Sequence, residues 1–580
     1  MLLNKNKVIL IIIILVACVL RFWQLGNVPP SPDWDEAALG YNAYSIKETG
    51  KDEYGEPFPI ILRSFDDYKP ALYSYIIIPF ITFFDLNILS VRFPSAIFGI
   101  LTVIATYFLV KELLKNSKSE IRNPKQIQNS NDQNSKKTLE ITSFTQTIIA
   151  LLSAFLLAIS PWHIQFSRIA FESNVGLALN VFSVLFFIKG VKKPLFLLPY
   201  TLCAGLSLYV YQSEKVFVPL LFILLVFIYR NTLFKLPKKY LVLSLIIGVV
   251  IASPIAHYTL TKKEALTRAQ GVSVFSEDNQ YLNDLSARNL INREKGDLIG
   301  LIFDNRRIFY AKSVIANYLS HYNIYWLFLS GDETRHHAPS MGLLYLWEFP
   351  FLFIGICGLI FGKWNTKLKL LTFGLFLLAP VPASVTTGVP HSVRTLNFLP
   401  TFQIFTAVGL TSFVMFISKI KYQIANIRIK YLIFTMYFLF FIFNISYYLN
   451  QYFVQQNYFY SQAWQYGYEE AVEEVKKIEG EYDKIIVSNQ PHLDQSYMFF
   501  LFYLQYPPAQ YQKESRGASG GFDEKHKFGK YIFRPIAWEK EKKDPKTLYV
   551  GRPNDFTSGV GVIKTINFLD GKVAIIIVRG

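Results

Sequence analysis

Long apolar runs constrain the fold of this chain more than any other feature. About eleven segments are long and apolar enough to cross a bilayer, which takes roughly 20 residues per helix. They occupy residues 8–25, 91–110, 146–161, 174–188, 195–211, 214–229, 240–257, 341–362, 370–390, 395–416 and 431–448. Hydrophobic residues make up 52% of the 580 residues and charged residues only 17%, a composition unlike that of soluble globular proteins. The sequence predicts a polytopic α-helical membrane protein.

Lysine and arginine residues between the apolar runs predict the orientation. The net charge is +17, and basic residues gather in alternate loops, with the largest number at 111–140. The positive-inside rule places these loops and the N-terminus in the cytoplasm, with 8–25 as an uncleaved anchor. Only one of 70–86 and 91–110 can then cross, and we expect 70–86 to be a juxtamembrane or re-entrant helix on the outer face. The basic excess is thus a topology signal, and nucleic acid is not an expected partner.

The same orientation predicts two domains in a multi-pass protein of the plasma (inner) membrane. Residues 1–448 form the transmembrane domain, and residues 449–580, which mix helical and strand-like patterns, form a small extracytoplasmic α/β domain. A final hairpin is expected around Asp570-Gly571. The other expected segments are outer loops at 26–90, 160–173 and 258–340 and a polar, disordered cytoplasmic linker at 116–139.

Charged side chains are scarce inside the runs, where Glu348 is the main exception, and collect instead at the outer ends. The first outer loop carries Asp33, Asp35, Glu36, Arg63 and Lys69. The D-x-x-E spacing from Asp33 to Glu36 is also that of a capping box, which would give these acids a purely structural role. The second outer loop adds Arg168 and Glu172, for which an interfacial arginine and a solvated acid are the structural alternatives.

Several motifs in the first 220 residues, WDEAALGYNAYSI, YKPALYSY, VRFPSAIFG and PWHIQFSRIAFES, carry a family resemblance. Their order and spacing resemble the membrane glycosyltransferases of the dolichyl-phosphate-mannose protein mannosyltransferase and aminoarabinose transferase type. The resemblance implies the GT-C fold. It also implies that Asp35, with Glu36 beside it, is the catalytic base or orients the acceptor, and that Lys69 binds the lipid-linked phosphate. Glu172 matches a second-loop acid that is more often Asp in the family.

Physical chemistry agrees with these roles. Sugar transfer from a polyprenyl phosphate needs a carboxylate to take the acceptor's proton and cations to stabilise the departing phosphate. Lys69 supplies the charge, helped by Arg63, Arg168 or Arg21, and a Leu- and Phe-rich groove between spans would take the isoprenoid chain. No nucleotide-binding loop is needed, and no credible one occurs.

Two histidine-containing segments at the outer face are further candidates. His336 and His337 are adjacent, so both cannot easily reach one metal ion, and we expect a substrate or interfacial contact instead. His391 and Arg394 either contact the lipid phosphate or anchor the interface. Cys18, Cys203 and Cys357 lie in apolar runs without paired spacing, so neither a disulfide framework nor a cysteine zinc site is expected. A divalent metal stays open, because outer-loop acids could hold one.

The leading hypothesis is an inverting glycosyltransferase that uses a polyprenyl-phosphate sugar at the outer face of the membrane. A polysaccharide polymerase or ligase is the alternative enzyme, and a lipid-linked sugar exporter is the non-enzymatic alternative. An exporter should carry polar residues along its spans, and these spans do not. The expected partners are membrane lipid, the lipid-linked donor and an acceptor lipid, protein or glycan. The donor sugar, the acceptor and the oligomeric state are left open.

Overall fold

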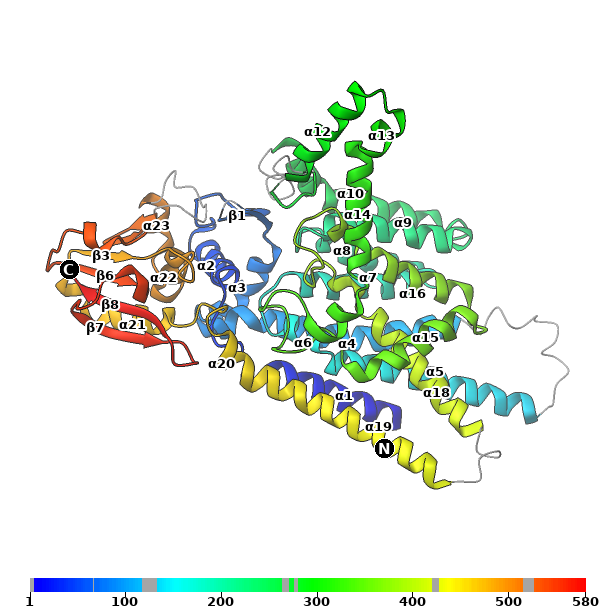
Figure 1. Cartoon of the computed structure of the whole chain (residues 1–580). Coiled ribbons are helices and arrows are strands. Elements are labelled where there is room, and N and C mark those ends of the chain that lie inside the picture. Colours follow the sequence, from blue (N-terminus) through cyan, green and yellow to red (C-terminus); the bar gives the residue numbers. More distant parts are fainter. Residues whose placement is uncertain are drawn as a thin grey trace.

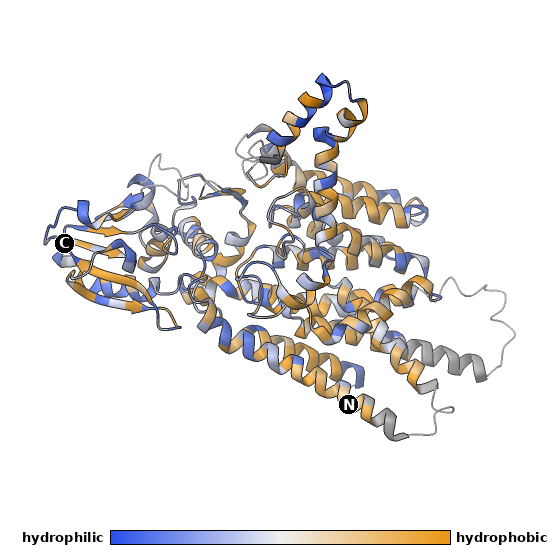
Figure 2. Ribbon diagram, in the orientation of Figure 1, coloured by the Kyte–Doolittle hydropathy of each residue, from blue (hydrophilic) through white to orange (hydrophobic). Residues whose placement is uncertain are grey.

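A bundle of roughly parallel helices with a sheet domain at one end makes up the computed structural model of the chain (Figure 1). The structure describes residues 5–65, 67–116, 133–262, 271–275, 280–419, 427–514 and 526–580. Hydrophobic residues run along the helices of the bundle (Figure 2). Most of the linker expected at 116–139 lies outside the described residues, and the next helix, α5, already begins at Gln133.

Each of the apolar runs contains a helix, as expected. These helices are α1 (Lys5–Phe22), α4 (Ile88–Asn116), α5 (Gln133–Ile159), α7 (Ser173–Gly190), α8 (Leu197–Ser207), α9 (Glu214–Leu233), α10 (Lys238–Thr261), α15 (Phe349–Phe361), α16 (Thr366–Leu378), α18 (Thr401–Lys419) and α19 (Ile427–Asn450). Within the described ranges, six helices are long and apolar enough to cross a membrane, or seven if the bent pair of α5 and α6 is one span. Helix length and apolarity therefore account for six or seven of the roughly eleven predicted spans.

Helix α3 (Leu72–Phe84) occupies the segment that we expect not to cross the membrane. It has 13 residues and contains Pro79. At 1.5 Å per residue it is about 20 Å long, whereas the hydrocarbon core is about 30 Å thick. Its length fits a juxtamembrane or re-entrant position.

Helices α15 and α18 pack closely because each presents a glycine to the other. A Cβ atom on Gly355 would lie 1.8 Å from the carbonyl oxygen of Phe405, and one on Gly409 would lie 1.9 Å from that of Phe351. Small residues allow such close backbone approach between membrane helices, where dispersion contacts drive association. This contact holds α15 and α18 together. Helix α15 precedes the loop at 385–395 in the chain, and α18 follows it.

The first outer loop folds into α2 (Trp34–Thr49) and a hairpin of β1 (Ile61–Ser64) and β2 (Asp67–Pro70). Antiparallel pairing places Leu62 opposite Lys69. The other segments predicted to lie outside the membrane contain α6 (Pro161–Ser167), α12 (Gln280–Glu294), α13 (Leu298–Phe303), α14 (Arg306–Ser320) and a helical turn at Trp326–Ser330, and α17 (Val381–Ser384) follows α16. Two irregular stretches between them, 331–340 and 385–395, are important for the site.

The C-terminal segment is an α/β domain, as predicted. Its mixed sheet has the order β4-β5-β3-β6-β8-β7, and β7 and β8 form the expected final hairpin. The strands are β3 (Lys484–Val487), β4 (His526–Phe528), β5 (Tyr531–Phe533), β6 (Thr547–Gly551), β7 (Val562–Asn567) and β8 (Val573–Arg579), and the helices are α20 (Gln456–Tyr460), α21 (Tyr468–Ile478), α22 (Ser496–Leu504) and α23 (Pro508–Glu514).

This domain shares one hydrophobic core with the first outer loop. Side chains of α2 and α3 belong to the same buried cluster as those of α22 and the sheet. Polar contacts reinforce the junction: the Tyr41 hydroxyl donates to the carbonyl of Tyr506, and the Gln512 amide donates to Ser45, Thr49 and the carbonyl of Asp52. Figure 1 shows the sheet domain beside α2 and α3. The domain therefore supports the loop that carries Asp35 and Lys69.

Candidate functional site

An ion pair between Asp35 and Lys69 lies at the centre of the candidate site. Asp35 stands in the first turn of α2, where the helix dipole favours an acid, and Lys69 stands on β2. The Lys69 ammonium donates to Asp35 Oδ1. The Lys69 side chain is 9% exposed and that of Asp35 is 26% exposed, so the pair is sheltered and still accessible. The structure brings together the two residues that the sequence indicates most strongly.

Glu172 is the third member of this group. It is buried directly before α7 and interacts electrostatically with both Lys69 and Asp35. Burial raises its pKa to about 7, although Lys69 acts in the opposite direction. Burial lowers the pKa of Lys69, but the carboxylates of Asp35 and Glu172 outweigh it, so the net direction is upward. The lysine is thus held protonated between two carboxyl groups.

Tyr211 is a residue of this site that the sequence did not indicate. It lies in the turn between α8 and α9, and burial raises its pKa to about 12. Arg394, Glu172, Asp35 and Lys69 all act electrostatically on its hydroxyl. Arg394 itself donates to Thr386 Oγ1 at 2.6 Å and to the carbonyl of Thr387 at 2.8 Å. Tyr211 therefore lies within electrostatic range of both Arg394 and the ion pair.

Glu36 has a structural environment instead of a catalytic one. It closes the capping box with Asp33, as the D-x-x-E spacing indicates. It is fully buried and pairs with Arg92, whose Nε and Nη2 lie 2.9 and 2.8 Å from its two oxygens. The backbone N–H of Ala170 also donates to it at 2.8 Å. Since both oxygens are engaged, Glu36 joins α2 to α4 and to the second outer loop.

Arg168 and Arg21 also serve the scaffold. Arg168 is buried and donates to the backbone carbonyls of Leu20, Arg21, Gln24 and Val28, so its guanidinium fastens the end of α1. Arg21 donates to the carbonyls of Ala17, Ala158 and Leu157, and one of its nitrogens lies 2.6 Å from His163 Nδ1. Neither guanidinium is directed at Lys69 by these contacts.

Arg63 lies over the ring of Tyr54, 4.5 Å from its centroid. It lines a cavity of about 500 Å³ together with aromatic residues that include Tyr68 and Tyr258 and the carboxylates of Asp52 and Glu56. Tyr68 and Lys69 are neighbours on β2, so their side chains point to opposite faces of the hairpin, and the cavity is lined on the Tyr68 side. Aromatic faces beside carboxylates and a guanidinium suit a polar ligand with apolar faces, such as a sugar.

A second cavity of about 500 Å³ is almost entirely apolar. It lies between α8, α9 and α10, and Leu208, Val218, Phe222 and Leu241 are among its lining residues. Val218 is near the start of α9 and Leu241 near the start of α10, so the groove extends along much of the bundle. It has the character of the groove that the sequence predicts for an isoprenoid chain.

The irregular stretch 331–340 is tied to the first outer loop. Arg335 Nη1 lies 2.7 Å from Asp33 Oδ2, and its guanidinium lies over the ring of Trp34. Burial raises the pKa of Asp33 to about 6, while Arg335 lowers it. The stretch therefore lies next to the N-terminal end of α2, close to Asp35.

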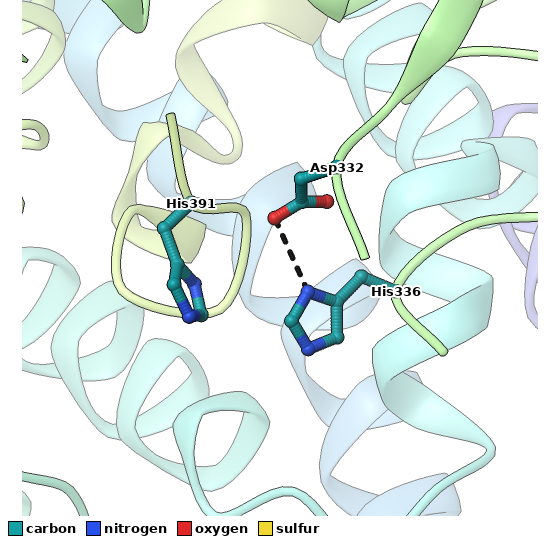
Figure 3. Close-up of side chains that lie close together, drawn as sticks. All are labelled: Asp332, His336 and His391. Carbon is teal, nitrogen blue, oxygen red and sulfur yellow. Dashed lines mark hydrogen bonds and ion pairs between the residues drawn. The ribbon is translucent and has the colours of Figure 1, made fainter. Parts of the chain in front are cut away.

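His336 and His337 diverge, as their adjacency predicts. His336 Nδ1 lies 3.1 Å from Asp332 Oδ2, and its ring lies 5.2 Å from that of His391 (Figure 3). The Nδ1–H of His337 instead donates to the carbonyl of Ala338 at 2.8 Å, and its ring packs against Gly331. Burial would raise the pKa of Asp332, but His336, His391 and the Ser392 N–H hold it low, at about 2. Asp332 is a residue that the sequence did not indicate.

Comparison with known proteins connects this geometry to a family. Residues 11–119 match the family model described as dolichyl-phosphate-mannose-protein mannosyltransferase. A search of curated proteins found no match. ArnT from Cupriavidus metallidurans in the apo state is 11% identical, with 99% of this chain and 98% of that chain covered and a TM-score of 0.53. Its undecaprenyl phosphate complex is 10% identical, with 98% and 97% covered and a TM-score of 0.54.

These findings confirm the resemblance on which the sequence analysis relied. The family match covers the anchor, the first outer loop and α4. Asp35 and Lys69 lie in that first outer loop. The structural match extends over nearly all of both chains and supports a polytopic membrane fold with a C-terminal sheet domain. The chain therefore has the GT-C fold and resembles membrane glycosyltransferases of the dolichyl-phosphate-mannose protein mannosyltransferase type.

Proposed function

We propose that the chain is an inverting glycosyltransferase that moves a sugar from a polyprenyl-phosphate carrier to an acceptor hydroxyl on a lipid, protein or glycan. The observation that carries the proposal is the Asp35–Lys69 ion pair, with Glu172 beside it, at one end of an apolar helix bundle. A cation and a carboxylate in contact provide both functions that the transfer needs. The solved complex of ArnT with undecaprenyl phosphate shows that this fold accommodates such a carrier.

In the proposed reaction the acceptor oxygen attacks the anomeric carbon from the face opposite the phosphate. Asp35 takes the proton of the acceptor hydroxyl, the new C–O bond forms, and the bond between the anomeric carbon and the phosphate oxygen breaks. The electron pair of the broken bond stays on the polyprenyl phosphate, whose charge Lys69 stabilises. The phosphate competes with Asp35 for Lys69, so donor binding loosens the ion pair and frees the carboxylate.

The two cavities suit the two ends of the donor. The apolar groove between α8, α9 and α10 takes the isoprenoid chain, since burial of each CH₂ group in an apolar setting contributes about 0.8 kcal/mol. The polar cavity at Arg63, on the Tyr68 face of the β1–β2 hairpin, takes a sugar, either the transferred one or the acceptor. Arg394, which lies within electrostatic range of Tyr211, adds positive charge near the site.

The proposed location is the outer face of the plasma membrane. The basic loops between the apolar runs favour a cytoplasmic N-terminus and place the Asp35 loop and the C-terminal domain outside. There the carrier phosphate lies at the interface, within reach of Lys69.

Membranes containing the full chain and a radiolabelled polyprenyl-phosphate sugar test the proposal. Wild-type membranes should transfer label to an acceptor fraction, Asp35→Asn should abolish transfer, and Lys69→Met should raise the donor concentration needed. Glu48→Gln and Lys47→Ala are matched controls, because Glu48 and Lys47 form an exposed ion pair on the same helix. Retained transfer in Asp35→Asn would remove Asp35 from the mechanism.

The products distinguish the alternatives. A polymerase would build labelled chains of several sugars, whereas the proposed transferase adds one. Movement of the intact lipid-linked sugar across the membrane, without transfer, would identify an exporter and contradict the proposal.

A further inference from the structure

A group of metal-ligating side chains joins two irregular stretches beside the site. Asp332 and His336 come from 331–340, and His391 comes from 385–395. One ligand atom from each lies within 4.8 Å of the other two. Figure 3 shows the two imidazoles and the carboxylate converging from opposite sides. Nothing in the proposed transfer reaction uses these three residues.

The carboxylate is held in place from the opposite loop. The backbone N–H of Ser392 donates to Asp332 Oδ2 at 2.7 Å, and the Ser392 hydroxyl donates to Oδ1 at 2.9 Å. The backbone N–H of His391 donates to His321 Nε2 at 3.2 Å, which fixes the chain at the other ligand. Ligands whose supporting contacts already exist need little rearrangement to bind an ion.

The buried member of the group is His336, whereas Asp332 and His391 are partly exposed. His336 is 6% exposed, and its ring lies 5.8 Å from the rings of both Phe166 and Phe171. An apolar wall limits competition from water for an ion and strengthens its attraction to the carboxylate.

The ligand set and spacing fit a first-row divalent cation. Two imidazoles and one carboxylate are a set that binds Zn²⁺ with a fourth position open. Two ligands about 2.0 Å from one tetrahedral ion lie about 3.3 Å apart, and His336 Nδ1 and Asp332 Oδ2 are separated by 3.1 Å. The third ligand atom, on His391, lies within 4.8 Å of the other two. Calcium or magnesium would instead prefer a site made of oxygen atoms.

We propose that Asp332, His336 and His391 bind one Zn²⁺-class cation, which joins residues 331–340 to residues 385–395 next to the donor site. Arg335 ties the first of these stretches to Asp33, and Arg394 in the second acts on Tyr211. A bound ion would therefore fix the position of the two stretches, 331–340 and 385–395, relative to the Asp35–Lys69 pair. This inference does not depend on the proposed transfer reaction.

The test uses the full chain, purified in detergent without a histidine tag, stripped with a chelator and reloaded with Zn²⁺ alone. We expect one zinc per chain by elemental analysis and a higher melting temperature with the ion than without it. His391→Gln and Asp332→Asn should each weaken zinc affinity at least 10-fold. His337→Gln is the matched control, because His337 is adjacent in sequence but bonds to the carbonyl of Ala338.

Each outcome decides the proposal. Absence of stoichiometric zinc in the reloaded wild type would overturn it, as would equal loss of zinc in His337→Gln and His391→Gln. Comparing the melting temperatures of the stripped proteins separates a folding defect from lost binding: His391→Gln should match the stripped wild type and gain nothing from zinc. If the stripped variant melts well below the stripped wild type, the residues form only a structural hydrogen-bonded group.

Discussion

Asp35 and Lys69 form an ion pair although 34 residues separate them in the chain. The hairpin of β1 and β2 brings the lysine back to the start of α2, and the C-terminal domain supports both elements. The pair thus depends on the tertiary fold of the first outer loop.

Removing the charge of Asp35 should affect turnover more than donor binding. In Asp35→Asn the acceptor keeps its proton, so kcat should fall about 10²- to 10⁴-fold, the usual contribution of a general base. In Lys69→Met the donor KM should rise instead. Steady-state kinetics with a purified acceptor measure both, and the reverse pattern would exchange the assigned roles.

Glu172 should make stability depend on pH. Its pKa of about 7 lies above the ordinary 4.5, so the folded state holds a proton that the unfolded state has released. Protonated Glu172 therefore stabilises the folded state fully below pH 4.5. This stabilisation is lost as pH rises through about 7, and the free energy of unfolding falls by at most about 3 kcal/mol. Melting temperatures of wild type and Glu172→Gln across this range should diverge as pH rises, with Gln the more stable. Parallel curves would contradict the assignment.

Glu36→Gln should destabilise the protein instead of removing a catalytic group. The change leaves the buried guanidinium of Arg92 without its charge partner, which typically costs about 3–5 kcal/mol. Thermal unfolding in detergent measures the loss, and Glu48→Gln is the exposed control. A Glu36→Gln protein with wild-type stability and no activity would support a catalytic role after all.

Gly355→Val should separate α15 from α18. The new side chain would overlap the Phe405 carbonyl, so the helices must move apart and lose dispersion contacts. We expect a loss of several degrees in melting temperature or of folded yield. Gly358→Ala is the control, because a Cβ there meets only ordinary contacts at 3.8 Å.

Much of this fold can be predicted from the sequence because its signals are local. Apolar runs predict a helix in each segment of the bundle, and strand-like runs in the tail predict β3, β5, β6, β7 and β8. The capping box at Asp33 and Glu36 is also a local pattern, and the structure contains it. By contrast, the length of each helix depends on where a turn interrupts it. Hydropathy alone does not predict the position of these turns.

The residues that the sequence analysis missed act through distant partners. Arg92 pairs with Glu36 across 56 positions, and Ser392 bonds to Asp332 across 60. The hydrophobic periodicity of the sequence does not indicate such distant pairs. A signal for Arg92 did exist, since an arginine inside an apolar run needs a buried partner. Arg168 shows the opposite case, because its charge suggests phosphate binding while its burial commits it to backbone carbonyls.

The shared core of the C-terminal domain and the first outer loop has a consequence for biosynthesis. Domains generally fold as the chain emerges, with N-terminal parts first. Here α2 and β2 are synthesised early, but the residues that cover them, from Ser496 to Glu514, are synthesised much later. A nascent or truncated chain would therefore insert its helices and still have no assembled donor site, so activity would begin only when synthesis is complete.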